Sequence, residues 1–380
     1  MKKILFRKLL LDYLRFLFLA LISTSIVIWV FQAVNYLDIM IEDGRDYLVY
    51  INFSLLNFPK IFSKILPFIL FFSVFYVTTK YELNNELMVF WNFGINKIQV
   101  INFMLTISIL FIIFQIFFTS LLIPKSQDLA RSFLRTSNVN FFGNFIKPKK
   151  FNDTIKGVTI YTEKKDKNGN LENLYLKKEI DENNFQITYA KKGIFKEIGN
   201  MPILVLYDGA TITSKNNDIT NISFSKSDFS LANVETNTTT YKKTQEISSF
   251  KLIKCINNYF KYKKKDFELI SSDIENCSTS NINNIFKEIY KRFVIPFYLP
   301  ILTLVPFLII IISKENPKYH KLRLLTFLIG LIIIIFSETT IRYITDKTIL
   351  NLSLLITPLL LLLTVYLYFF FKFKTKVNYN

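Results

Sequence analysis

Residues 14–37 of the chain read LRFLFLALISTSIVIWVFQAVNYL, an almost unbroken run of apolar side chains. A helix of about 20 mostly apolar residues can cross the hydrocarbon core of a bilayer. Lipid offers the backbone no hydrogen-bond partners, so such a segment must be helical. Five more runs of this kind follow, at Ile61–Thr79, Ile98–Ile123, Phe293–Ser313, Leu324–Tyr343 and Ile349–Phe371. The sequence therefore predicts an α-helical bundle of six transmembrane helices, with three helices before and three after a long polar insertion.

The composition agrees with a membrane bundle joined to a polar domain. Hydrophobic residues make up 51% of the chain, yet 20% of the residues are charged. The formal net charge of +18 raises the possibility of a nucleic-acid partner, but no helix-turn-helix, zinc-finger or RNA-binding signature accompanies it. Cationic faces beside a membrane also meet anionic lipid head groups. We expect no nucleic acid among the partners.

Lysine and arginine in the short loops predict the orientation, because such residues gather on the cytoplasmic side. They lie at Lys2, Lys3, Arg7 and Lys8, between the fourth and fifth runs at Lys314, Lys318, Lys321 and Arg323, and in the tail at Lys372, Lys374 and Lys376. The loop at 38–58 instead carries Asp38, Glu42, Asp43 and Asp46 against Arg45. We therefore expect both termini in the cytoplasm and the large insertion outside.

The insertion changes its pattern twice. Val158 and Ile160, and then Leu174 and Leu176, alternate with polar residues on either side of an Asn-Gly turn at 166–170, which is typical of a β-hairpin. Further short alternating segments favour an antiparallel sheet that curls into a sandwich or roll. Ser248–Tyr262 and Asn281–Tyr290 are then amphipathic and predict two helices.

We expect four parts in the chain. They are transmembrane helices 1–3 in 1–123 with a cytoplasmic helix near 81–95, a β-domain in 124–250, a helical connector in 251–291, and transmembrane helices 4–6 in 292–380.

The sequence argues against several kinds of chemistry. It has only nine glycines and no phosphate-binding Gly-rich loop, so the chain is not expected to hydrolyse ATP itself. The only histidine is His320, and no metal-ligand pattern surrounds the two cysteines, Cys255 and Cys277, so we expect neither a cofactor nor a metal site. We expect these cysteines to be reduced; a disulfide in an oxidising compartment is the alternative.

Tyr81–Ile95, the turn between the second and third runs, predicts a short interfacial helix that ends at Gly94. Glu82 and Glu86 are four residues apart and share one face, whereas Leu83, Leu87 and Phe90 share another. An acidic face of this kind suits the docking of a soluble partner; a solvated loop is the alternative.

Glu86-Leu87 followed by Gly94-Ile95 resembles the coupling segment of the lipopolysaccharide-export permeases of the LptF/LptG (YjgP/YjgQ) family. The order of three helices, an outer β-domain and three helices is similar too, as are Ile123-Pro124 after the third run and Arg292–Pro296 at the fourth. The start of the β-domain, 147–169, is closer to the LptF type.

The resemblance implies a non-catalytic permease of the bacterial inner membrane, with a β-jelly-roll in the periplasm. Its partners would be a cytoplasmic ABC ATPase dimer, a second homologous permease, bitopic and periplasmic transport proteins, and lipopolysaccharide. Glu86 would meet the ATPase, with Glu82, Leu87, Phe90 and Gly94 in the same coupling segment. The jelly-roll would pass the lipid onward along an apolar face, which strand alternation places at Val158, Ile160, Leu174 and Leu176.

Some members of the family carry a basic residue near the outer end of the first helix, where the phosphates of the lipid arrive. This chain has Gln32 and Asn35 there, with Arg45 as the nearest cation. The other lipid-binding candidates are Arg292, at the start of the fourth helix, and Glu338 with Arg342. The last two are four residues apart and could pair inside the bundle or at its surface.

Two other functions are weaker candidates. A membrane glycosyl- or phospholipid-transferase could use the acidic loop 38–46, with Asp38, Glu42, Asp43 and Asp46 as general bases or metal ligands. A mechanotransmitting permease of the four-helix type is disfavoured by the symmetric plan of three plus three helices.

Overall fold

The computed structural model describes residues 2–37, 47–136, 146, 148–155, 158–166, 170–181, 184–198, 201–215, 218–230, 242–261, 274–345 and 348–374. Arg45 and the acidic residues Asp38, Glu42, Asp43 and Asp46 lie outside them. The chain forms two compact units. The helical unit comprises 1–31, 55–131 and 241–380, and the β unit comprises 32–54 and 132–240.

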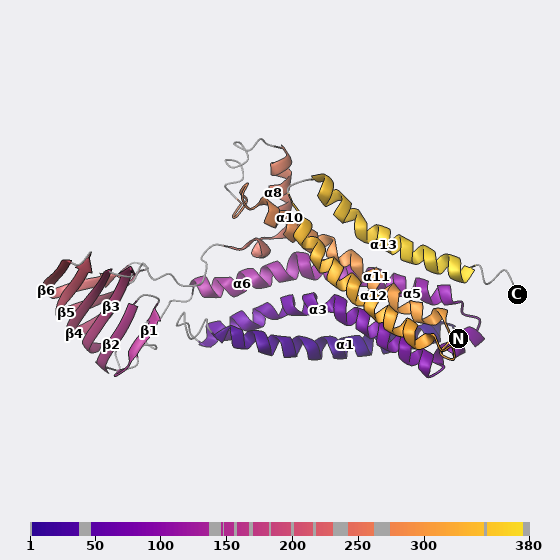
Figure 1. Ribbon diagram of the computed structural model, residues 1–380, viewed down its shortest axis with the longest axis horizontal. Coiled ribbons are helices and arrows are strands. Elements are labelled where there is room, and N and C mark those ends of the chain that lie inside the picture. Colours follow the sequence, from indigo (N-terminus) through magenta and orange to yellow (C-terminus); the bar gives the residue numbers. More distant parts are fainter. Residues whose placement is uncertain are drawn as a thin grey trace. The chain divides into compact units, whose positions relative to one another are not determined.

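The apolar runs are helices, as predicted (Figure 1). The long continuous ones are α1 (Lys2–Asn35), α3 (Tyr47–Leu83), α5 (Lys97–Phe117) with its extension α6 (Ile123–Thr136), α12 (Tyr319–Thr340, followed by the 3-10 turn η5, Ile341–Tyr343) and α13 (Thr348–Lys374). Five of the helices in the described part of the chain are long and apolar enough to cross a membrane, and a bent pair provides a sixth segment. The predicted helical membrane bundle is therefore confirmed, with five continuous segments and a sixth if the bent pair is one span.

The broken segment joins α10 (Ile282–Phe293) to residues Ile295–Ile311 with a bend of about 40°. Its second half consists of η3 (Ile295–Tyr298), α11 (Leu299–Leu304) and η4 (Val305–Ile311), of which η3 and η4 are 3-10 helices. Pro296, Pro300 and Pro306 stand near the starts of these pieces. Each proline removes a backbone donor and crowds the preceding turn, which explains the repeated breaks.

The third apolar helix continues past Ile123, where the sequence analysis ends it. A π-helical turn, η1 (Phe118–Leu122), joins α5 to α6. Pro124 leaves the carbonyl of Ser120, four residues earlier, without its usual helical partner. The Ser249 hydroxyl donates to that carbonyl at 2.8 Å, so a side chain from elsewhere in the helical unit stabilises the irregular turn.

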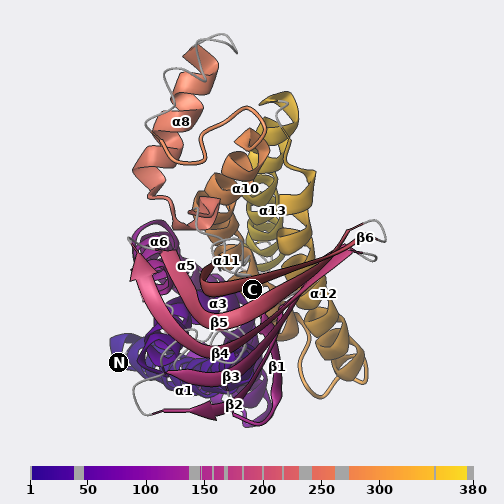
Figure 2. The ribbon, with the colours of Figure 1, turned by 90° about the vertical axis from the view of Figure 1, so that its left-hand side faces the viewer.

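The β unit contains a six-stranded antiparallel sheet whose strands pair in sequence order (Figure 2). The strands are β1 (Phe151–Ile155), β2 (Val158–Lys165), β3 (Leu171–Asp181), β4 (Asn184–Ile198), β5 (Met201–Lys215) and β6 (Asp218–Ser230). The predicted hairpin is β2–β3, with Ile160 opposite Leu176; the tip of its turn, 167–169, lies outside the described residues. Figure 2 shows long strands that curve together around one face, and the described strands form an up-and-down meander.

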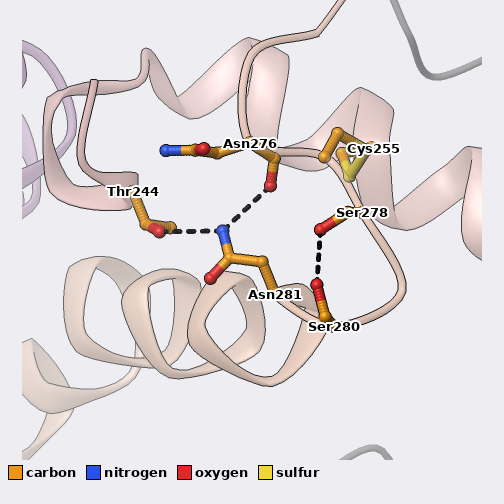
Figure 3. The surroundings of a disulfide bond; sticks show 7 residues. Thr244, Cys255, Asn276, Ser278, Ser280 and Asn281 are labelled. Atoms are coloured by element: carbon orange, nitrogen blue, oxygen red, sulfur yellow. Dashed lines mark hydrogen bonds between the residues drawn. A yellow bond between two sulfur atoms is a disulfide. The ribbon is translucent and has the colours of Figure 1, made fainter. Parts of the chain in front are cut away.

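The helical unit also contains the 3-10 turn η2 (Thr244–Glu246) and α8 (Ser249–Lys261), which precede α10. Both predicted amphipathic helices are thus confirmed. The expectation of reduced cysteines is wrong, because Cys255 of α8 forms a disulfide with Cys277 (Figure 3). The sequence separation of 22 residues did not reveal that folding brings the two Cα atoms to 6.0 Å, a normal disulfide spacing. A cross-link over a loop of this size stabilises the fold by about 3 kcal/mol.

Gly330 allows α12 to pack directly on α3. A Cβ atom added to Gly330 would lie 2.0 Å from the ring of Phe71, which is fully buried and whose ring centre lies 6.0 Å from that of Phe327. No side chain fits at this crossing, so glycine is required by close packing here rather than by an unusual backbone angle.

We therefore predict that Gly330→Ala lowers the thermal unfolding temperature of the protein in mild detergent. Alanine normally favours a helix over glycine by about 1 kcal/mol, but overpacking costs about 1–3 kcal/mol. Ile332→Ala, at a side chain that is 63% exposed on the same helix, is the matched control and should leave the unfolding temperature nearly unchanged. Adding Phe71→Leu to Gly330→Ala should restore stability. A higher unfolding temperature in Gly330→Ala alone would contradict the packing argument.

Candidate functional site

A cavity of about 630 Å³ lies among the helices of the helical unit. Its cationic lining residues come from α3, from the position just before η2 and from α10, which are far apart in the sequence; they are Lys60, Lys64, Lys243, Lys287, Lys291 and Arg292. Glu288 and Glu338 are the carboxylates of the lining. We call this space the basic cavity. Its excess of positive charge predicts an anionic ligand.

Helical spacing explains how two of the walls carry these side chains. Lys60 and Lys64 are one turn apart on α3, so they share a face. Asn284, Lys287 and Lys291 follow one another on α10 at intervals of three and four residues, so they share another face.

Arg292 is 1% exposed and builds one wall of the cavity. Its Nε donates to Glu288 at 3.0 Å, one Nη donates at 2.9 Å to both the Ile247 carbonyl and the Ser249 hydroxyl, and the other Nη donates at 2.9 Å to the Gln245 carbonyl. A buried cation needs such partners, since its desolvation is costly. Its hydrogen bonds fix the segment Lys243–Ser249, which we call the strap.

Further contacts hold the strap in place. Arg131 of α6 binds the buried carboxylate of Glu246 at 2.7 Å. Lys60 donates to the Gln245 side chain at 3.3 Å. The π-helical turn contributes as well, because the Thr119 hydroxyl donates to the Arg292 carbonyl at 2.9 Å. The strap is therefore attached to α3, to α6 and to α10.

The disulfide loop supports the strap from another side (Figure 3). Asn281 donates from its side-chain amide to Thr244 at 3.2 Å and to the Asn276 carbonyl at 2.9 Å. The Asn276 side chain in turn donates to the Lys242 carbonyl. Because Asn276 precedes Cys277, the disulfide also fixes this corner of the basic cavity.

Two glutamines add neutral hydrogen-bonding groups to the lining. Gln115 donates to the backbone and hydroxyl oxygens of Ser63, both at 3.0 Å. Gln127 is 3% exposed, yet neither atom of its amide has a partner among the described residues. A buried amide without a partner is unfavourable, so Gln127 is suited to a ligand that carries hydroxyl or amide groups.

Only some of the predicted lipid-binding residues line the basic cavity. Arg292 and Glu338 line the basic cavity, whereas Arg342 is exposed and is not part of the lining. Gln32 and Asn35 belong to the β unit, where Gln32 accepts a hydrogen bond from Tyr36 at 3.1 Å. Arg45 lies outside the described residues.

The sequence analysis missed the lysines of the cavity. Lys64 offered a signal, because it is a charge inside the apolar run Ile61–Thr79, and charged residues within membrane spans usually have a function. Lys287 and Lys291 stand in a helix predicted only as a connector, so their approach to α3 could not be read from the chain.

The predicted coupling segment is divided in two. α3 continues through Glu82 to Leu83, and α4 (Glu86–Asn92) begins after Asn85, whose φ is +59°. Leu87 and Phe90 of α4 are each 3% exposed and join the core of the helical unit.

Gly94 ends α4 as predicted, with a φ of +68° that suits glycine at this position. Its N–H donates to the Trp91 carbonyl, and the N–H of Ile95 donates to the Phe90 carbonyl, both at 3.0 Å. These two hydrogen bonds satisfy carbonyls that the helix end would leave unpaired.

The outer face of α4 remains accessible. Met88 is 54% exposed and Phe93, just after the helix, is 46% exposed. The Glu86 carboxylate forms an ion pair with Lys8 of α1 at 3.3 Å. An apolar surface with an acidic corner is thus firmly anchored to the helical core beneath it.

The four apolar side chains predicted to line the β-domain share one face. Val158, Ile160, Leu174 and Leu176 belong to a single buried cluster, and none is more than 6% exposed. In the described part of the chain, side chains of the sheet pack on this face together with Ile146, which precedes β1.

Comparison with known proteins was made on the whole sequence. The family model described as "Lipopolysaccharide export system permease LptF/LptG" matches residues 7–372. A protein of Rickettsia prowazekii (strain Madrid E), named "Uncharacterized protein RP871", is 24% identical over 309 residues, which cover 80% of this chain and 82% of that protein. Since the family model spans nearly the entire chain, including both groups of membrane helices and the β unit, this protein belongs to the lipopolysaccharide export system permease LptF/LptG family.

Proposed function

We propose that the chain is the permease subunit of an ABC transporter that extracts lipopolysaccharide from the inner membrane and passes it to a periplasmic bridge. The observation that carries this proposal is the basic cavity, enclosed by helices that are apolar enough to span a bilayer. Lipopolysaccharide presents phosphates on a sugar head group next to acyl chains. The cavity offers cations, neutral amides and apolar side chains in one place.

Each part of the cavity has a task in this proposal. Lys64, Lys287 and Lys291 bind phosphate through charge-assisted hydrogen bonds, which are stronger than neutral ones. Gln127 binds sugar hydroxyl or amide groups. Arg292 has a different task from the lipid contact first expected of it, because its guanidinium already binds Glu288 and the strap. It positions the wall against which the head group lies.

The energy for extraction comes from a separate cytoplasmic ATPase dimer that docks on α4. Glu86, Met88 and Phe93 form the docking surface, while Leu87 and Phe90 connect it to the helical core. A movement of the ATPase would therefore move α4 together with α1 and α3. A second homologous permease completes the membrane part, and this chain acts as the LptF-type partner.

Both termini lie in the cytoplasm in this proposal. The amino-terminal end, the coupling segment and the carboxy-terminal helix gather at one end of the helical unit. Lys2 donates to the Gly94 carbonyl at 3.0 Å, and the ammonium of Lys97 lies 5.6 Å from the ring centre of Phe373. The lysine-rich loops favour the cytoplasm for this end, which leaves the basic cavity toward the periplasm. The β unit, inserted between the third and fourth apolar runs, is periplasmic in the same topology.

The β unit receives the lipid after extraction, together with the bitopic and periplasmic transport proteins. Acyl chains cross an aqueous compartment only when shielded, since each exposed CH₂ group costs about 0.8 kcal/mol. The face that carries Ile160 and Leu176 provides the shield, with acyl chains entering between side chains that otherwise pack on each other.

We predict that Lys64→Glu reduces the lipopolysaccharide retained by the purified protein at least roughly tenfold, because a hydrogen bond to a charged group is worth about 1.5–3 kcal/mol. Lys64→Arg should keep most of the bound lipid. Lys321→Glu, which makes the same charge change at an exposed position of α12, is the control. Mass spectrometry of lipid per mole of protein measures the effect. Equal retention in Lys64→Glu and Lys321→Glu would remove the phosphate-binding role.

We also predict that Glu86→Ala leaves the protein folded but abolishes most of its association with the ATPase. The ion pair with Lys8 is exposed, and such pairs contribute only about 0–1 kcal/mol to stability. Lys8→Ala breaks the same ion pair while keeping the carboxylate, so it should preserve association. Pull-down of the ATPase in mild detergent distinguishes the two variants. Loss of association in both variants would show that the internal ion pair, rather than docking by Glu86, is what matters.

A third prediction concerns the β unit. A photo-crosslinking amino acid at Ile160 or Leu176 should capture lipopolysaccharide during ATP-driven transport, because both side chains lie on the buried face. The same amino acid at Glu163, which is exposed three residues later in β2, should not. Circular dichroism confirms that each variant retains its sheet. Equal capture at Ile160 and Glu163 would make the sheet a scaffold rather than a path.

A further inference from the structure

Helix α8 has an inner side that is firmly attached to the helical unit. Leu252 and Cys255 are fully buried, and they pack with Ile282 and Ile285 of α10. The disulfide from Cys255 to Cys277 adds a covalent link (Figure 3). The rotation of α8 about its own axis is therefore fixed, and so is the direction of its other sides.

The outer sides of α8 carry large apolar groups beside cations. Phe250 is 78% exposed, Ile253 is 49% exposed and Phe260 is 57% exposed. Their spacing of three and seven residues places them along one side of the helix. Lys254 and Lys261 follow next to them around the helix, and Ser249–Lys261 contains no carboxylate.

α8 begins beside the π-helical turn that joins α5 to α6 in the third apolar helix. Ser249, its first residue, donates to the Ser120 carbonyl in the π-helical turn of the third apolar helix. α10, against which α8 packs, is the first half of the bent apolar segment. Figure 1 and Figure 2 both show α8 running across the direction of the long helices, at the end away from the amino terminus.

This combination fits a lipid surface better than a protein partner. Aromatic and aliphatic groups flanked by lysine are typical of helices that lie in the membrane interface. The central parts of protein–protein interfaces are depleted in lysine. Anionic phospholipid head groups attract lysines that lie beside an apolar surface.

We propose that α8 is an interfacial helix that inserts Phe250, Ile253 and Phe260 into the bilayer leaflet at this end of the bundle, with Lys254 and Lys261 on anionic phospholipid head groups. The proposal goes beyond lipopolysaccharide export and does not depend on it. The helix would hold the connector and the strap against the membrane surface while the transport cycle moves other parts.

Spin labelling tests the proposal in the full-length protein. No free cysteine is present in the described part of the chain, so Ile253→Cys provides a specific site for a nitroxide. Lys251→Cys is the matched control, because Lys251 is also exposed but lies farther around the helix from Ile253 than Lys254 and Lys261 do. Both variants are placed in nanodiscs of phosphatidylcholine and phosphatidylglycerol. Peptide mass spectrometry checks that Cys255 and Cys277 remain paired.

The nitroxide at position 253 should collide mainly with oxygen, which concentrates in lipid, and the one at 251 mainly with a water-soluble nickel chelate. A label at Phe250→Cys should behave like the one at 253, and nanodiscs of phosphatidylcholine alone should weaken the difference. Equal nickel collisions at 253 and 251 would overturn the proposal. The proposal would also be overturned if the label at 253 were shielded from the nickel chelate only after a partner protein is added. That result would assign this side of α8 to a protein contact.

Discussion

The guanidinium of Arg292, 1% exposed, binds Glu288 and the strap at the same time. Removing one partner of such a buried charge costs about 3–5 kcal/mol, because the other is left uncompensated. The Arg292 carbonyl also accepts a hydrogen bond from Thr119 in the π-helical turn. A single residue thus joins α10, the strap and the irregular part of the third apolar helix, and the walls of the basic cavity depend on it.

The cations in and around the basic cavity are of two kinds: some form ion pairs within the protein, and others are accessible to a ligand. Arg292 and Arg131 are engaged with Glu288 and Glu246. Lys64 of α3 and Lys291 of α10, by contrast, are exposed and line the same space. A lysine beside a membrane-spanning segment is tolerated where it faces a polar cavity rather than lipid. The same division applies at α4, where buried Leu87 and Phe90 anchor a surface whose outer residues are accessible.

The parts of the fold that follow from periodicity could be predicted from the sequence. The apolar runs, the β2–β3 hairpin and the amphipathic helices α8 and α10 all depend on local patterns. The breaks at Pro296, Pro300 and Pro306 also have a local cause, because each proline removes a backbone donor. The disulfide could not be predicted, because it depends on which segments meet in space. The basic cavity belongs to the second group, since Lys64 and Lys287 are brought together only by the packing of α3 and α10. The end of α4 near Gly94 could be predicted because a helix terminator is a local signal.

The central claim is that the basic cavity binds the phosphorylated head group of lipopolysaccharide. A cryo-electron microscopy structure of the assembled transporter with lipopolysaccharide bound tests it most directly. The account predicts head-group phosphates within hydrogen-bonding distance of Lys64 and of Lys287 or Lys291, with Arg292 still bound to the strap. Lipopolysaccharide found elsewhere in the complex, with the basic cavity occupied by water or phospholipid, would contradict it.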